Sequence, residues 1–496
     1  MTAAAAGAFS PALIKEARAL SATYCAALTM VAVGSVSSSY VLIASGLLGF
    51  AFGSVALGAQ SFGHEYSYRT LGLLLSQPLD RRRLFLYKLA VLSVMLSTLT
   101  AITLLLFRDL LQRAASPHTE PSMLVLAAAC GLFVAPWLSM LCRSPLAAVV
   151  FTIAIPGLLA TGADIVGSLI YGLHNAAAID RFKLIVFWRG MFLICALAAV
   201  AGWRMFMRLE VIEGHGPDVE IPESLRALSG TTVDTPARRH HPMWALAGKE
   251  LRLQQMALVV AAIYVFLWVA VAWLQRPVED VPALPLGGMT MLYSAVLAML
   301  SGSLASAEER HLGTLEWQML LPMPAWQQWA VKVSVAFGLV LLLGAGLPAV
   351  LGYLTPGDQD LVTNGWQQVS LWLMVVPLTA GSLYVSTLCR SGVEALVLSF
   401  PSVVATLLFV RTVGDTIGPL IFRLSYPAGS RPFLSAYEIG LLLLAVGGGL
   451  VALLLWLAFL NHRSADRSVA RSSKQVLVIA GYISIGLAVL ILLGLG

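Results

Sequence analysis

The ionisable residues of this sequence offer little that could do catalytic chemistry. We find no Ser/His/Asp array, no paired carboxylates suited to acid–base catalysis and no Cys-x-x-Cys spacing, and the one adjacent His pair lies in a polar segment. We therefore predict no catalytic residues and no metal site. The phosphate-binding pattern Gly-x-x-x-x-Gly-Lys-Ser/Thr is also missing, so the chain itself is not expected to bind ATP.

Charged, hydroxyl and proline residues do recur at a fixed spacing in two polar segments. Apolar residues lie at helical spacing in both segments, and a Pro in each would end the helix. A Glu comes first in both, where the helix dipole favours anions. We predict that each segment begins a short amphipathic helix under a membrane; a helix that merely caps the bundle is the alternative. The recurring residues are Glu65, Thr70, Leu71, Pro78 and Lys88, and then Glu309, Thr314, Leu315, Pro322 and Lys332.

The composition indicates which elements must position these segments. Of the 496 residues, 58% are hydrophobic and only 11% are charged, whereas a soluble domain has about 25% charged residues. A soluble enzyme is therefore excluded, and we predict an all-α polytopic membrane protein. The net charge of +6 is expected to set its orientation in the membrane, and nucleic acid is not an expected partner.

Thirteen apolar runs are long enough to cross about 30 Å of hydrocarbon as helices. Most Lys and Arg residues fall on one side if the N-terminus is cytoplasmic, so the positive-inside rule predicts that orientation in a plasma (bacterial inner) membrane, with the C-terminus outside. An amphipathic stretch with Lys15, Glu16 and Arg18 is predicted to be a separate interfacial helix. The predicted spans are residues 19–38, 40–61, 84–107, 122–142, 145–168, 185–207, 254–275, 286–306, 329–353, 366–388, 393–412, 437–460 and 476–495.

The two halves of the chain carry the same motifs in the same order. Besides the two polar segments, three motifs recur at equivalent places relative to the spans. Each half contains six spans, an even number, so we predict two parallel six-helix repeats, with a pathway between them, plus one extra C-terminal transmembrane helix. The further motifs are Lys15-Glu16 with Lys249-Glu250, 139–144 with 386–391, and Trp203 and Phe206 with Trp456 and Phe459.

These repeats divide the chain into four parts. Residues 1–207 and 244–462 are each predicted to form a module of one interfacial helix and six spans. Residues 208–243 are polar, contain Pro, Gly, Glu and Thr, and lack apolar periodicity, as expected of a cytoplasmic linker. Residues 463–496 are predicted to form a basic loop and the thirteenth span.

The arrangement resembles the membrane subunit of type-2 ABC exporters. The similarity lies in a Lys-Glu helix, two spans, a Glu-x-x-x-x-Thr-Leu-x6-Pro-x9-Lys segment and four more spans, and residues 309–316 are especially similar. Because it covers residues 10–210 and 243–462, the chain resembles two permease modules fused in tandem. In that family the polar segment is the coupling helix, which docks into a groove of a separate ATPase subunit. The resemblance therefore implies two ATPase copies as partners, which bind the ATP and Mg, and no cofactor in this chain.

The resemblance also implies which residues make the coupling contacts. Gly72 stands in the first segment where Glu316 stands in the second, so the two docking contacts are expected to be unequal. The coupling residues implied are Glu65, Arg69, Thr70 and Leu71, and then Glu309, Arg310, Thr314, Leu315 and Glu316.

Two ionisable residues, Asp164 and Arg411, lie inside predicted spans at equivalent repeat positions. Each follows a repeated Arg, Arg143 or Arg390, by about 31 Å of helix, which places it near the outer face. Two solvated span ends would explain this placement. The alternative hypothesis is an ion pair across the pseudo-twofold axis that helps to close the outer end of the pathway.

Three functions are compared on these observations. The leading hypothesis is a non-enzymatic permease subunit that exports or extracts an amphiphile from the lipid, with energy from a separate ATPase. The alternative is an integral-membrane lipid-modifying enzyme or membrane assembly factor, which would need acid, base or metal ligands gathered at one membrane face. An ion-driven carrier would need charges in the middle of spans and often has inverted repeats, and neither is found.

Overall fold

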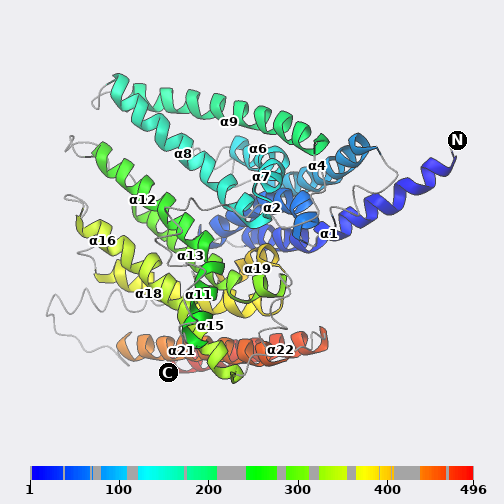
Figure 1. Ribbon diagram of the computed structural model, residues 1–496. Helices are drawn as coiled ribbons and strands as arrows, with labels where there is room; N and C mark the ends of the chain where they lie inside the picture. The colour runs from blue at the N-terminus through cyan, green and yellow to red at the C-terminus, as the bar shows by residue number, and fades with distance from the viewer. Residues whose placement is uncertain are drawn as a thin grey trace, which may run out of the picture.

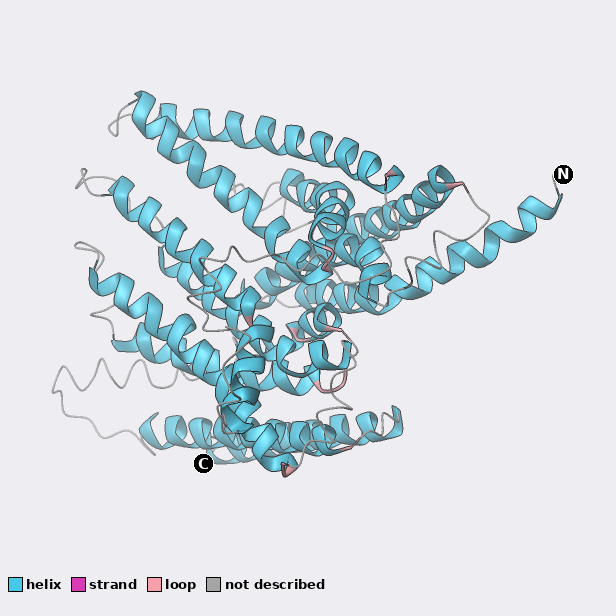
Figure 2. Cartoon of the chain, in the orientation of Figure 1, coloured by secondary structure: helices cyan, strands magenta, loops and turns pink. Residues whose placement is uncertain are grey.

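Nearly all residues that the computed structural model describes are helical, and none of them lies in a strand (Figures 1 and 2). It describes residues 3–36, 40–67, 70, 80–108, 121–171, 176–208, 242–275, 286–311, 323–354, 365–389, 391–403, 405–406, 436–464 and 469–494. Ten helices within these ranges are long and apolar enough to cross a membrane, and two shorter apolar helices cover Leu371–Ser386 and Gly392–Val403. The chain is therefore an all-α polytopic membrane protein.

The helices follow the thirteen predicted apolar runs, each of which coincides with a helical stretch over its described residues. In the first half the helices are α1 (Ala3–Val36), α2 (Tyr40–Ser67), α4 (Arg81–Leu106), α6 (Pro121–Ala129), α7 (Ala135–Cys142), α8 (Pro145–Tyr171) and α9 (Ala176–Met207), with a π-helical turn, Cys130–Val134, between α6 and α7. In the second half they are α11 (Pro242–Leu253), α12 (Gln255–Gln275), α13 (Leu286–His311), α15 (Ala325–Leu339), α16 (Leu347–Leu354), α18 (Gly365–Ser386), α19 (Gly392–Leu398), α21 (Ala436–Arg463) and α22 (Val469–Gly494), with a second π-helical turn, Val340–Gly346, between α15 and α16.

The predicted interfacial helix before the first span is not a separate element. Residues 15–20, Lys-Glu-Ala-Arg-Ala-Leu, are good helix formers without a breaker, so α1 continues through them into the span. The second half does separate the two, because α11 ends at Leu253 and α12 begins at Gln255. The residue between them, Gln254, is buried and its Nε2 donates to the carbonyl oxygen of Ser301, at 2.9 Å. This tertiary hydrogen bond holds the break.

Glycines allow the second span of each half to cross another helix at close range. A Cβ atom on Gly58 of α2 would overlap the carbonyl oxygen of Gly131, in the first π-helical turn. A Cβ atom on Gly302 of α13 would overlap the Ser382 hydroxyl and lie 2.8 Å from the carbonyl oxygen of Thr379, both in α18. Without a hydrophobic driving force between helices in lipid, such close backbone contact is a main source of packing energy.

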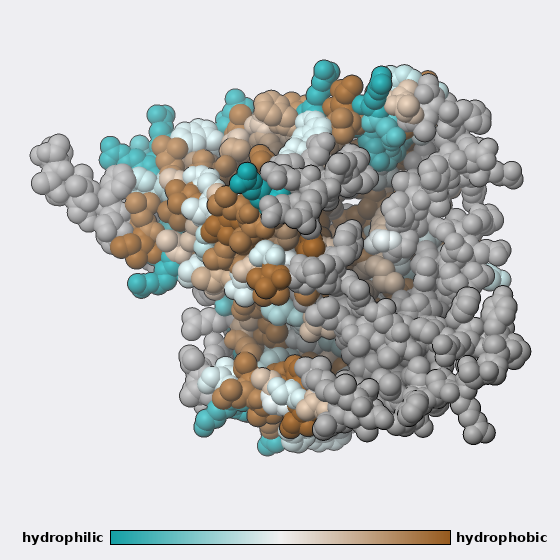
Figure 3. Space-filling model, turned by 180° about the vertical axis from the view of Figure 1, so that it is seen from behind, coloured by the Kyte–Doolittle hydropathy of each residue, from teal (hydrophilic) through white to brown (hydrophobic). Residues whose placement is uncertain are grey.

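The two halves meet along α1, α2 and α8 of the first and α12 and α19 of the second. The rings of Phe52 and Phe400 pack edge-to-face across this interface, 4.9 Å apart, within a core cluster that draws buried residues from both halves. Apolar residues cover much of the described surface in Figure 3, and hydrophilic residues gather near its edges. This distribution suits a molecule surrounded by lipid.

The last helix, α22, packs against α21 through a buried amide pair. Gln475 Nε2 donates to Asn461 Oδ1 at 2.7 Å, and Asn461 Nδ2 donates to Gln475 Oε1 at 3.0 Å. The Tyr384 hydroxyl of α18 also donates to Gln475, at 3.2 Å. Figure 1 shows the N-terminal end of α1 and the C-terminal end of α22 on opposite sides of the bundle.

Candidate functional site

The first half contains a buried lysine held between two carboxylates from different helices. Lys88 of α4 contacts Glu16 of α1 at 2.8 Å and Glu65 of α2 at 3.2 Å. Its ammonium also donates to the carbonyl oxygen of Ser61, one turn before Glu65, at 3.2 Å. The other oxygen of Glu65 accepts a hydrogen bond from the Thr70 hydroxyl. We name Glu16, Glu65 and Lys88 the first lysine cluster.

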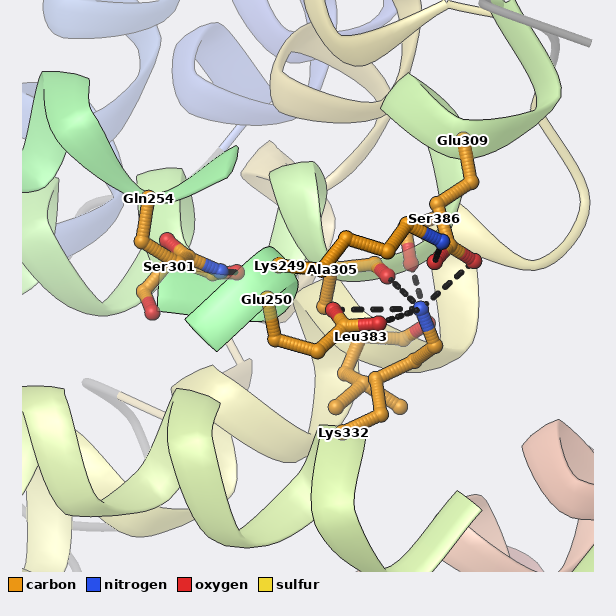
Figure 4. A network of polar contacts seen from close by, with 9 residues as sticks. All are labelled: Lys249, Glu250, Gln254, Ser301, Ala305, Glu309, Lys332, Leu383 and Ser386. Carbon is orange, nitrogen blue, oxygen red and sulfur yellow. Dashed lines mark hydrogen bonds and ion pairs between the residues drawn. The ribbon is translucent and has the colours of Figure 1, made fainter. Parts of the chain in front are cut away.

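The second half contains the same arrangement, shown close up in Figure 4. Lys332 of α15 lies 2.6 Å from Glu309 of α13 and donates to Glu250 of α11 at 3.1 and 3.3 Å. Its ammonium also donates to the carbonyl oxygen of Ala305, again one turn before the Glu, at 2.5 Å. Glu309 contacts a second cation, Lys249, at 2.6 Å. Glu250, Glu309 and Lys332 form the second lysine cluster.

Helix electrostatics explain why the lysines are needed. Glu65 and Glu309 lie in the last turns of α2 and α13, and not in the first turn of a new helix as the sequence pattern predicted. The C-terminal end of a helix is negative, so a carboxylate there is unfavourable. Both carboxylates are also buried, where an unpaired charge is costly. Lys88 and Lys332 supply the compensating charge from the next span.

One carboxylate of the second cluster lies outside the membrane-spanning helices and titrates unusually. Burial and the nearby charge of Glu309 raise the pKa of Glu250 above its usual range, against the opposing attraction of Lys332. Two carboxylates that share one ammonium repel each other. Glu250 is therefore easier to protonate than an exposed carboxylate.

Three other pairs of repeated positions also make matching contacts. The hydroxyls of Ser144 and Ser391 cap α8 and α19 by accepting from the N–H three residues later, at 3.3 and 3.2 Å. The hydroxyls of Ser139 and Ser386 donate to the carbonyl oxygen three residues earlier, at 2.9 and 2.7 Å. The aromatic pairs Phe85–Phe206 and Trp329–Phe459 have ring centroids 5.3 and 6.4 Å apart.

The predicted coupling residues do not all lie where a partner could contact them. Glu65 and Glu309 are buried, 2% and 0% exposed, so their carboxylates face the lysine clusters and not the surface. Thr70 holds Glu65, and Arg310 is half-buried beside Glu309. The sequence pattern gave no site role to Glu16, Lys88, Glu250 or Lys332, although all four were repeated positions. Arg69, Leu71, Thr314, Leu315 and Glu316 lie outside the described residues.

Asp164 has a partner other than the predicted one. Its carboxylate contacts the Lys183 ammonium of α9 at 2.8 Å, and the two side chains are 19% and 34% exposed. Arg411 lies outside the described residues. The predicted outer ion pair with Arg411 therefore stays a hypothesis, and Lys183 competes with Arg411 as the partner of Asp164.

A double-mutant cycle distinguishes the two partners of Asp164. We expect Asp164→Lys and Lys183→Asp each to lower the thermal stability of the purified protein slightly, and the double swap to restore it, with a coupling energy of about 0–1 kcal/mol because the pair is partly exposed. Rescue of Asp164→Arg by Arg411→Asp, with no rescue by Lys183→Asp, would instead establish the pair across the axis.

An apolar cavity of about 280 Å³ lies at the interface of the halves. Phe52 of α2 and Val149 of α8 line it from the first half, and Val260 of α12 and Leu396 of α19 line it from the second. Two stacked tyrosines of its wall, Tyr264 and Tyr293, have centroids 3.8 Å apart. Their hydroxyls are engaged, with Thr290 and with the carbonyl oxygen of Leu343, so the rings present an apolar surface. The cavity suits an apolar chain.

The chain matches no family model, no curated protein and no solved structure. Its function is therefore argued from its own geometry. Two features carry that argument: the matching lysine clusters, one in each half, and the apolar cavity between the halves.

Proposed function

We propose that this chain is the membrane permease of a type-2 ABC exporter, with two permease modules fused in one polypeptide. It moves an amphiphile across or out of the membrane, and a separate ATPase subunit, in two copies, supplies the energy. The chain itself hydrolyses nothing and needs no cofactor. The N-terminus and the polar segments lie in the cytoplasm, and the halves are parallel repeats.

The observation that carries this proposal is the matching pair of lysine clusters. Each cluster joins the helical residues that precede the first span of its half, within α1 or in α11, to the end of the second span and the start of the third span. The segment that resembles a coupling helix begins directly after the clustered Glu. A force on that segment would therefore reach three helices at once. Matching clusters in both halves favour two ATPase sites, one in each half, whose contacts differ at Gly72 and Glu316.

The test is reconstitution with a partner. The full chain, co-expressed with an ABC ATPase subunit of the same organism, should purify as a complex, and ATPase activity in nanodiscs should change when the permease is present. Because Glu309 is buried, its replacement would change the stability of the protein as well as any coupling to the ATPase. Thr314 and Glu316, in the segment that resembles a coupling helix, are the better targets, and Thr314→Ala with Glu316→Ala should reduce transport per ATP hydrolysed by about tenfold or more, while the complex still forms.

The matched control is Lys183→Gln, at the far end of the bundle, which should leave coupling unchanged. Normal transport by the Thr314/Glu316 variant would refute the coupling assignment. If no complex forms and ATPase activity is unaffected, the transport proposal fails. Turnover of a lipid by the purified chain alone would then favour the alternative, an integral-membrane lipid-modifying enzyme.

A further inference from the structure

A second cavity lies at the interface of the halves, at the end of the bundle that holds the lysine clusters. Its volume is about 270 Å³. The first half supplies Arg18 and Thr23 from α1 and Gln60 and His64 from α2, and the second half supplies Ser391 and Glu394. Unlike the apolar cavity, this polar cavity therefore offers a cation, an anion and several hydrogen-bonding groups.

The polar and apolar cavities share three lining helices, α2, α8 and α19. On α2, Phe52 lines the apolar cavity and Gln60, about 12 Å further along the helix, lines the polar one. On α8, Val149 lines the apolar cavity and Pro145 lines the polar one. On α19, Leu396 lines the apolar cavity and Val393 lines the polar one. A molecule that follows these helices passes from a polar site near the membrane surface to an apolar site within the membrane.

The polar cavity carries opposite charges on its two sides. Arg18 is exposed and permanently cationic, and a guanidinium matches phosphate oxygens in a bidentate geometry. Glu394, across the interface, offers a carboxylate that suits an ammonium group. The Thr23 hydroxyl donates to Gln60 Oε1 at 2.5 Å, which leaves the amide nitrogen of Gln60 as the donor for a ligand.

The acid is present in one half only. Glu394 follows the capping Ser391 by three residues, and the residue that follows the capping Ser144 by three is Ala147. Arg252, which corresponds to Arg18 in the sequence repeat, therefore has no such acid at the equivalent repeat position. The combination of both charges occurs once in the chain, which predicts one site and not two.

We propose that the polar cavity binds the headgroup of a zwitterionic amphiphile, with its phosphate at Arg18, its ammonium near Glu394 and its apolar chain directed to the apolar cavity. This inference rests on the proposed transport function, whose cargo class it names. The recognition combines one anionic and one cationic group on the same headgroup. A purely anionic or purely cationic amphiphile would satisfy only one side.

The test is binding by the full chain purified in an uncharged maltoside detergent without an ATPase. Three radiolabelled single-chain probes share a dodecyl tail: dodecylphosphocholine, dodecyl phosphate and dodecyltrimethylammonium. We expect dodecylphosphocholine to bind most tightly. Arg18→Gln should weaken the binding of dodecylphosphocholine and dodecyl phosphate about tenfold, because the phosphate loses its charge-assisted contact. Glu394→Gln should weaken the binding of dodecylphosphocholine and dodecyltrimethylammonium by a similar factor, because the ammonium loses its contact.

The matched control is Arg252→Gln, the same change at the corresponding residue of the other half, which should alter binding less than twofold. Size-exclusion profiles and melting curves establish that each variant folds. Equal binding of the three probes, or equal effects of Arg18→Gln and Arg252→Gln, would overturn the inference. ATPase-driven transport without zwitterion binding refutes this site alone, whereas zwitterion binding without any ATPase complex refutes the proposed function and leaves the site standing.

Discussion

Replacing Lys332 with Met will lower the free energy of unfolding by about 3–5 kcal/mol, the typical cost of removing one partner of a buried ion pair. Met keeps the length of the side chain and removes only the ammonium. The like charges of Glu250 and Glu309 would then face each other, with Lys249 as the remaining cation beside Glu309, and the Ala305 carbonyl would lose a donor. Unfolding of the detergent-solubilised protein, followed by intrinsic fluorescence, measures the loss.

Two control variants test whether the loss of stability comes from the buried charges or from removing any lysine. Lys474→Met, at an exposed position of α22, should leave stability unchanged. Adding Glu250→Gln and Glu309→Gln to Lys332→Met removes the unpaired charges and should recover most of the loss. Lys332→Met with the stability of the unsubstituted protein would mean that the cluster does not hold α11, α13 and α15 together.

Replacing Gly58 with Ala should destabilise the first half by about 1–3 kcal/mol or more, because a single methyl group has no space at this helix crossing. Its Cβ would meet the Gly131 carbonyl oxygen, which is backbone and cannot rotate away. Gly302→Ala should show the same sign, although the Ser382 hydroxyl, its nearest neighbour, can move. Thermal unfolding and the yield of monodisperse protein measure both effects.

The matched control is Gly162→Ala in α8, where a Cβ meets nothing within 4 Å. This substitution should be neutral or slightly stabilising, because Ala favours helix more than Gly does. Gly58→Ala and Gly162→Ala with equal stabilities would contradict the close crossing of α2 and the π-helical turn.

The positions of the helices could be predicted because the bilayer sets both their length and their composition. A run of about 20 apolar residues leaves few alternatives to a spanning helix. The same reasoning failed at the start of the first span, where it predicted a break near Arg18. Polar and apolar helix formers continue one helix equally well, and the break in the second half lies at Gln254, whose side chain bonds to a distant residue that the local sequence does not reveal.

The candidate site was predictable only in part, because the sequence pattern gave site roles to Glu65 and Glu309 but none to the other four members of the two lysine clusters. The repeated spacing identified Glu65 with Lys88 and Glu309 with Lys332, and the structure pairs each of them. Hydropathy falls at a buried carboxylate as it does at the end of a span. The sequence pattern therefore places Glu309 at the start of a new helix, although it lies in the last turn of α13. The contacts from Glu16 and Glu250 join residues far apart in the sequence, and only the fold brings them to the lysines.

The helix α1 is much longer than a membrane span requires. Its 34 residues extend about 51 Å, well beyond the hydrocarbon core of about 30 Å, and its N-terminal part projects from the bundle in Figure 1. Glu16, bound to Lys88, lies at the base of this projecting part of α1, which we call the arm. From Glu16 to the end at Ala3 the arm is about 20 Å long, so a tilt of about 5° displaces its tip by roughly 2 Å. The first lysine cluster thus fixes the first span at the base of this arm, and a rotation of the span about the cluster moves the tip of the arm with it.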